Sequence, residues 1–299
     1  MARYLIINAD DFGMSHSTNT AVSRLLELGT ITSSTIMAPA PWAAEAVNFA
    51  KDHPGYAIGV HLTTTSEWGT YRWGPVYSGE TSSLRDKYGY MYAESDEFER
   101  CADIAQAENE LNAQIDRLIS LGLEPSHLDN HMGSMYGVAT GRTELLVSVL
   151  GIAAKRGLPF RIPSKFTDEQ FGNKTLEINI PREAVDAVFG QINEMTRQYR
   201  IATVDYLLPF EWGDEQRVSF EAYRNYVYDT IAAFPDGITE TYLHPAVESD
   251  ELKSITSRWR DRVWEYELFA DPATKAFLGS QDITLINYRD LVKLRGYAD

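Results

Sequence analysis

Two adjacent carboxylates, Asp10 and Asp11, come directly after the first apolar run of the chain, Tyr4–Asn8. Like charges side by side repel one another, and burial increases the cost. A bound cation would offset that repulsion and let both side chains stay ionised in a cleft. The pair could instead cap the helix that follows, but Ser15 is already a candidate for that cap. We therefore favour a cation at this point.

Histidines occupy comparable positions. The chain has six histidines, and four of them lie at the ends of apolar runs: His61, His127, His131 and His244. Imidazoles and carboxylates that come from different strands can meet and hold a divalent ion. The remaining two, His16 and His53, fall in helical stretches and are expected at the surface or at helix ends.

The segment from His127 to His131 carries three such groups at alternate positions. Alternate residues of a strand share a face, so His127, Asp129 and His131 point the same way if the segment is extended. Asp129 could orient a neighbouring histidine or serve as an alternative ligand. His131 fits either the wall of a site or the support of a ligand.

The predicted strands and helices of the whole chain indicate where these groups lie in the fold. Eight apolar runs are candidate buried strands: Tyr4–Asn8, Thr32–Met37, Ala57–His61, His127–Asn130, Pro159–Ile162, Ala202–Leu207, Ile238–Leu243 and Ile283–Asn287. Between them lie stretches of helical periodicity: Ser15–Gly29, Trp42–Lys51, Phe98–Leu121, Thr143–Arg156, Pro181–Tyr199, Phe220–Phe234 and Trp259–Phe269. This alternation predicts mostly parallel strands in a TIM-like (β/α) barrel, regular or distorted, with an open doubly wound sheet as the alternative.

Active sites of such folds lie at the carboxyl ends of the strands. Arg161 is near the end of the fifth run, and the seventh run contains Glu240 and leads into His244. Arg161 could line the site or only pair with a buried aspartate. His244 precedes a proline, so it could also mark a turn that ends the strand.

One connection is unusually long. We expect a single catalytic domain over residues 1–299, with an aromatic-rich insertion at about 64–97. Disordered segments are poor in aromatic residues, so this one is expected to be ordered. Its rings could cover the apolar face of a sugar or merely pack the loop itself. The substrate-binding candidates are Trp68, Tyr71 and Trp73, together with Trp212 from another strand end.

Composition narrows the class of protein. The net charge of −16 argues against nucleic acid or an anionic membrane as a partner. The single cysteine, Cys101, rules out a disulfide within the chain and a thiolate zinc cluster. No apolar stretch approaches the ~18 residues of a membrane span, and the first apolar run is too short for a signal peptide. A cytoplasmic protein is expected, and a homodimer is left open.

Four motifs together resemble the YdjC-type carbohydrate deacetylase family, whose members include chitooligosaccharide deacetylases. They are Asn8–Gly13, Gly59–Leu62, Pro125–His131 and Glu240–Pro245, and they follow the family's order. The resemblance implies a distorted (β/α) barrel. It also implies a divalent metal, Mg²⁺ or Zn²⁺, that serves to remove an N-acetyl group from a sugar.

The resemblance also implies roles for individual residues. The positions that match the metal ligands are Asp11, His61 and His127, and Asp10 matches the general base. His244 matches a general acid or transition-state stabiliser, His131 and Arg161 match residues that line the site, and Asp129 and Glu240 are expected to support the ligands from behind. The sequence departs from the family at Met132 and Ala246, next to the third and fourth of these motifs, which points to a different substrate pocket.

Hydrolysis of an amide needs an activated water, a polarised carbonyl and a protonated leaving amine. The leading expectation is therefore a metal-dependent deacetylase that acts on an N-acetylated sugar or short oligosaccharide. A metal hydrolase of another amide, an ester or a phosphoester is the alternative enzyme. A sugar-binding protein without chemistry is a further alternative, but it would not need Asp10, a carboxylate beside the metal that is not a ligand.

Overall fold

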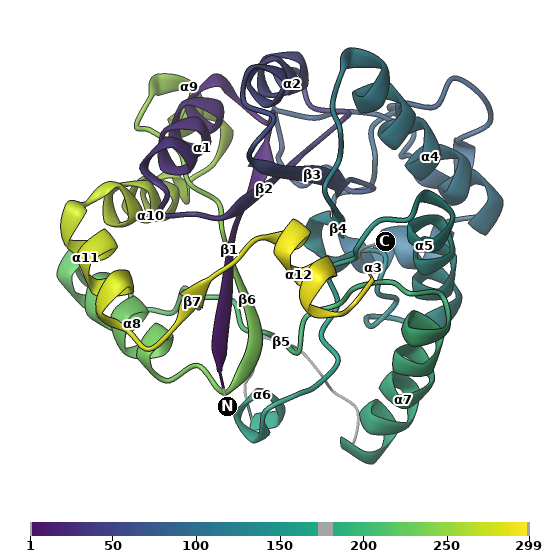
Figure 1. Ribbon diagram of the computed structural model, residues 1–299. Helices are drawn as coiled ribbons and strands as arrows, with labels where there is room; N and C mark the ends of the chain where they lie inside the picture. The colour runs from purple at the N-terminus through teal and green to yellow at the C-terminus, as the bar shows by residue number, and fades with distance from the viewer. Residues whose placement is uncertain (1, 173–181, 298–299) are drawn as a thin grey trace.

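The computed structural model describes residues 2–172 and 182–297. In this part of the chain the sheet has seven strands: β1 (Arg3–Phe12), β2 (Ser33–Ile36), β3 (Ala57–Leu62), β4 (Leu128–Asn130), β5 (Tyr206–Leu207), β6 (Gly237–Leu243) and β7 (Thr284–Leu285). Their order is β4-β3-β2-β1-β6-β5, all pairs are parallel, and β7 pairs with β1. Figure 1 shows the sheet curling inside a ring of helices. The prediction of a TIM-like, distorted barrel is confirmed, and the open sheet is not what forms.

The side of the barrel between β4 and β5 is built from irregular backbone. Leu128 N donates to Pro159 O at 2.9 Å, and Ser164 N donates to Val204 O at 3.0 Å. Only isolated bridges form there, Leu128 with Phe160 and Pro163 with Val204. The predicted strand Pro159–Ile162 is therefore not a regular strand, and the run 202–207 shortens to β5. Proline has no N–H to donate to a ladder, so the prolines at 159 and 163 limit regular pairing.

Helices surround the sheet. They are α1 (His16–Leu28), α2 (Ala43–Asp52), α3 (Ser95–Cys101), α4 (Ile104–Leu121), α5 (Thr143–Arg156), α6 (Asp168–Gly172), α7 (Arg182–Gln198), α8 (Phe220–Ala232), α9 (Asp250–Ile255), α10 (Trp259–Ala270), α11 (Pro272–Ser280) and α12 (Tyr288–Leu294). The short helical turns η1 (Ser82–Leu84) and η2 (His131–Gly133) lie in connections. None of the helices in the described ranges has the length and apolarity needed to cross a bilayer.

Local signals set most helix ends. The side chain of Ser15 accepts a hydrogen bond from Thr18 N at the start of α1, and Gly29 ends that helix with a φ of +69°. The predicted helix Phe98–Leu121 is two helices, α3 and α4. The Asp103 side chain accepts a hydrogen bond from Gln106 N and so caps the start of α4. The expected start of α7 at Pro181 lies outside the described residues.

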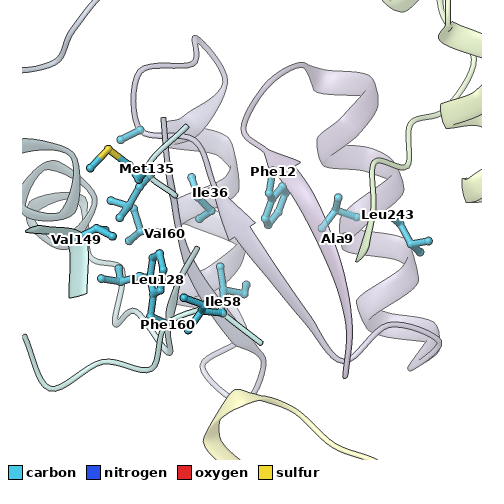
Figure 2. Close-up of a cluster of buried hydrophobic side chains, with 14 of the residues drawn as sticks. Ala9, Phe12, Ile36, Ile58, Val60, Leu128, Met135, Val149, Phe160 and Leu243 are labelled. Atoms are coloured by element: carbon cyan, nitrogen blue, oxygen red, sulfur yellow. The ribbon is translucent and has the colours of Figure 1, made fainter. Parts of the chain in front are cut away.

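The core fills both faces of the parallel strands. Figure 2 shows part of it, with side chains from β1, β2, β3, β4, β6, α5 and two connections: Ala9, Phe12, Ile36, Ile58, Val60, Leu128, Met135, Val149, Phe160 and Leu243. Strands covered on both faces carry continuous apolar runs, which is why the sequence located them.

The long connection between β3 and α3 is ordered against α4. Gln114 of α4 accepts from Thr63 N at 2.9 Å and donates to Thr63 O at 2.6 Å. Glu110, one turn earlier, accepts from the backbone N–H groups of Val76 and Tyr77. These contacts fix both the beginning and the middle of the aromatic-rich segment.

Candidate metal centre

The end of β1 is distorted at the two carboxylates. The pairing of β1 with β2 shifts register between Ala9 and Phe12, and Asp11 has a φ of +62°. Neighbouring side chains of a regular strand point to opposite faces. The irregularity lets both Asp10 and Asp11 lie close to His61 instead, where both raise its pKa. A left-handed conformation is costly for a residue other than glycine and is typical of functional sites.

Asp11 lies between two histidines. Its Oδ1 atom is 3.5 Å from His61 Nε2 and 3.5 Å from His131 Nδ1. This oxygen is buried and has no hydrogen-bond partner among the described residues. The ligand atoms of these three residues lie within 4.8 Å of one another. Ligands that bind zinc tetrahedrally at about 2.1 Å are about 3.4 Å apart, so the three donors fit a single ion.

In His61 and in His131, the ring nitrogen that does not face Asp11 is hydrogen-bonded to another carboxylate. His61 Nδ1 is 2.7 Å from Asp129 Oδ1, and His131 Nε2 is 3.0 Å from Glu67 Oε2. Asp129 is itself fixed by Thr35, whose hydroxyl donates to Oδ2 at 2.8 Å. Carboxylates of this kind orient the imidazoles of metal sites and set their tautomer.

The metal-free site favours positive charge on both rings. Burial alone would lower the pKa of His61, but Asp129 and Asp11 raise it to about 10. Burial likewise opposes the charge on His131, whereas Glu67 and Asp11 raise its pKa to about 9. Two buried imidazoles that attract protons this strongly mark a place where a cation is stabilised.

His127 lies outside this group of donors. Its ring stacks on Tyr288 of α12 with centroids 3.7 Å apart, and its Nδ1 is 2.8 Å from Ser126 Oγ. His127 precedes β4, whereas His131 follows it at the start of η2. The structure therefore brings His131 to Asp11 in place of the expected His127. Burial and Arg161 hold the pKa of His127 well below its usual range.

Asp10 is bound by Arg161 rather than by the histidines. The guanidinium donates to both Asp10 oxygens at 2.7 Å, and it also contacts Asp129 at 2.9 Å and Glu240 at 2.8 Å. Arg161 is 3% exposed, so the structure places it in a buried ion-pair network and not on an open wall. Burial would raise the pKa of Asp10, but Arg161 lowers it to about 2. Burial raises the pKa of Glu240 to about 7.

Helix α10 supplies two further groups that the sequence did not indicate. Arg262 donates to Asp11 Oδ2 at 2.8 Å, and Glu265 accepts from His244 N at 2.6 Å. Burial and Arg262 lower the pKa of His244, whereas Asp11 and Asp10 raise it. In the sequence, Arg262 and Glu265 lie inside a helical stretch and not at the end of a predicted strand. Residue types and spacing therefore gave no signal for them.

The aromatic residues divide into two groups. Trp68, Tyr71 and Trp73 contact one another with centroids 5.6 to 6.3 Å apart, and Trp73 lies 6.2 Å from His131. Trp73 is buried, whereas Trp68 and Tyr71 are half-buried. Trp212 is separate from these three; it stacks on Tyr223 at 4.0 Å and donates to Glu265 at 3.0 Å.

Comparisons with known proteins agree with the four motifs. A family model described as YdjC-like protein matches residues 4–280. The carbohydrate deacetylase of Geobacillus stearothermophilus is 29% identical over 297 residues, which cover 98% of this chain and 100% of that protein. A carbohydrate deacetylase of Listeria monocytogenes serotype 4a (strain HCC23) is 28% identical, with 96% and 99% covered. A protein of Enterococcus faecalis V583, described as a candidate cellobiose-phosphate cleavage protein, superposes with a TM-score of 0.74 at 26% identity and covers 97% of this chain and 99% of its own. This chain belongs to the YdjC-like protein family.

Proposed function

We propose that this protein is a divalent-metal-dependent hydrolase that removes an N-acetyl group from an amino sugar or a short oligosaccharide. The observation that carries the proposal is Asp11 Oδ1, placed 3.5 Å from a nitrogen of His61 and of His131, with the carboxylate of Asp10 alongside. The curated relatives that are named carbohydrate deacetylases support the substrate class.

In this proposal Asp11, His61 and His131 hold the ion. Two imidazoles and one carboxylate suit Zn²⁺ better than Mg²⁺, which prefers oxygen ligands. When bound, a divalent ion polarises the acetyl carbonyl and lowers the pKa of a water molecule toward ~7. Arg262 occupies the second oxygen of Asp11, which leaves Oδ1 for the ion.

Asp10 is the proposed proton acceptor. The contacts with Arg161 keep its carboxylate ionised and fix its orientation. Asp10 takes a proton from the attacking water and passes it to the leaving amine, so the proton count balances over the reaction. No covalent intermediate with the protein is needed.

His244 is better suited to transition-state stabilisation than to acid catalysis. Burial and Arg262 hold the pKa of His244 below its ordinary value, so the ring is neutral at neutral pH. A neutral imidazole can donate one N–H to the oxyanion that forms on the acetyl group. The half-buried rings of Trp68 and Tyr71 are the surfaces we propose for the apolar face of the sugar.

The test is acetate release from diacetylchitobiose by Zn²⁺-loaded protein, with a chelated sample and an Asp11→Asn variant beside it. Release that requires the metal and Asp11 supports the reaction and the substrate class. Zn²⁺-loaded protein that releases no acetate from any N-acetyl sugar, but hydrolyses a simple ester, would overturn the proposal in favour of another metal hydrolase. Saturable sugar binding without hydrolysis of either would indicate a binding protein.

A further inference from the structure

We propose that Glu67 is a positioning residue that fixes His131 for the metal and couples the aromatic segment, residues 64–97, to the metal centre. The inference rests on the proposed metal site, although not on the substrate. Glu67 belongs to the segment that joins β3 to α3, and its side chain is 20% exposed.

The contact with Glu67 selects one tautomer of His131. A neutral imidazole carries its proton on one nitrogen only, and an ionised carboxylate can only accept. Glu67 Oε2 is 3.0 Å from Nε2, so in the neutral ring that a metal requires the proton lies on Nε2 and the lone pair of Nδ1 faces Asp11. His131 thereby offers Nδ1 to the ion.

His61 is arranged in the opposite sense. Asp129 accepts from its Nδ1, which leaves Nε2 toward Asp11. The two imidazoles therefore present different nitrogens, and each needs its own carboxylate. Asp129 comes from the barrel itself, next to β3 in the sheet, whereas Glu67 comes from the aromatic segment.

Trp68, the residue after Glu67, contacts the arginine that holds Asp11. The ring of Trp68 lies 5.5 Å from the Arg262 guanidinium, and Arg262 donates to Asp11 Oδ2 at 2.8 Å. Trp68 also packs edge-to-face on Trp73 at 5.6 Å. Two consecutive residues of the segment thus contact the partners of two proposed ligands, so an ion that fixes the ligands also fixes this part of the segment.

The experiment compares Glu67→Ala and Glu67→Gln with Glu97→Gln, a control at an exposed position of α3. Zn²⁺ affinity is measured by competition with a chromophoric chelator, and hydrogen exchange of residues 64–97 is followed with and without Zn²⁺. We expect Glu67→Ala to weaken binding about 10- to 100-fold. Glu67→Gln should lose less, because its Oε1 can still accept from Nε2, and Glu97→Gln should match the wild type.

Exchange in the segment reports the coupling. Zn²⁺ should slow exchange around residues 66–73 in the wild type and in Glu97→Gln, and Glu67→Ala should lose that response. Wild-type Zn²⁺ affinity in both Glu67 variants would overturn the positioning role, and an unchanged exchange response in Glu67→Ala would overturn the coupling. Both readouts are independent of acetate release, so a failure of the deacetylase proposal would be seen separately as normal Zn²⁺ binding without hydrolysis.

Discussion

Asp10 and Asp11 are adjacent and identical, yet their partners give them different chemistry. Asp10 is held on both oxygens by Arg161, whereas Asp11 is held on Oδ2 by Arg262 and faces two histidines through Oδ1. The left-handed backbone of Asp11 makes this division possible, because it brings two consecutive side chains to one site. One carboxylate is therefore placed as a ligand and the other as a proton acceptor.

Asp10→Asn should separate these two roles. An amide cannot accept the proton, so kcat should fall about 10²- to 10⁴-fold while one Zn²⁺ per chain is retained. Stability should fall by about 1–3 kcal/mol, since Arg161 loses one hydrogen-bond acceptor but keeps Asp129 and Glu240 as charged partners. Metal content by atomic spectroscopy and acetate release, measured on the same folded sample, check the prediction. A variant that loses its Zn²⁺ would show that Asp10 is itself a ligand.

His131→Ala and His127→Phe should behave differently. Loss of a direct ligand should weaken Zn²⁺ binding by more than the about 100-fold expected for loss of a supporting residue. Phenylalanine at 127 keeps a ring to stack on Tyr288, so this variant should retain wild-type Zn²⁺ affinity and lose stability only. Titration with a competing chelator measures both. The reverse order of affinities would restore His127 as the ligand and remove His131.

Helix α10 acts on two strand ends at once. Arg262 and Glu265 are three residues apart and therefore on one face of the helix. Arg262 pairs with Asp11 at the end of β1, and Glu265 holds the backbone of His244 just after β6. Because β1 and β6 are neighbours in the sheet, one helix sets the spacing between a proposed ligand and the proposed stabiliser.

Glu265→Gln tests whether Glu265 holds His244 in position. Both oxygens of Glu265 accept, from Trp212 Nε1 at 3.0 Å and from His244 N at 2.6 Å. A glutamine has one acceptor, so its NH₂ must face one of these donors. We expect a stability loss of about 1.5–3 kcal/mol and a kcat reduced roughly tenfold, with Zn²⁺ affinity unchanged. Glu267→Gln, at an exposed position of the same helix, is the control. An unchanged kcat in a variant of lowered stability would make Glu265 purely structural.

Elements with strong local signals were predictable, and those that depend on packing were not. The continuous apolar runs located β1, β3 and β6, because both faces of these strands are buried. The motifs singled out Asp11 and His61 as ligands, and the structure places these two side chains 3.5 Å apart; their role as ligands stays a prediction. The third motif offered both His127 and His131, and the turn from β4 into η2, which residue spacing does not reveal, brings His131 to Asp11. Glu67 and Arg262 could not be found in this way, because they reach the site only through the path of the aromatic segment and the packing of α10.

At the scale of the whole molecule, the site concentrates negative charge in a chain whose net charge is already −16. Among the described residues, five carboxylates pair with His61, His131 or Arg161: Asp10, Asp11, Glu67, Asp129 and Glu240. Two guanidinium groups, Arg161 and Arg262, oppose them and leave three negative charges when all five are ionised. Either two protonated imidazoles or one divalent ion reduces this excess to one. The ion and the two protons are therefore electrostatic substitutes for each other.

This substitution predicts how metal removal should affect stability at different pH values. The pKa of His61 is raised from 6.5 to about 10 in the folded, metal-free protein, and that of His131 to about 9. Their contribution to stability is complete below the unfolded value of 6.5 and is lost as the pH rises through the folded values. Zn²⁺ binds neutral imidazoles and keeps its own charge at every pH, so the loaded protein does not lose stability in this way. Zn²⁺ also binds more tightly as the pH rises, because fewer protons must be displaced from the two rings.

The difference in Tm between loaded and chelated protein should therefore widen as the pH is raised from about 6.5 to about 8.5, where the imidazoles begin to lose their protons. Each tenfold gain in affinity adds about 1.4 kcal/mol when Zn²⁺ is in excess over its Kd. Calorimetric Tm values at several pH values, with and without a chelator, measure the difference. Asp11→Asn, which lacks one ligand, should show little difference at any pH. A wild-type difference that stays constant or narrows over this range would mean that the proton and the metal do not compete for the same two rings, and that the cation lies elsewhere.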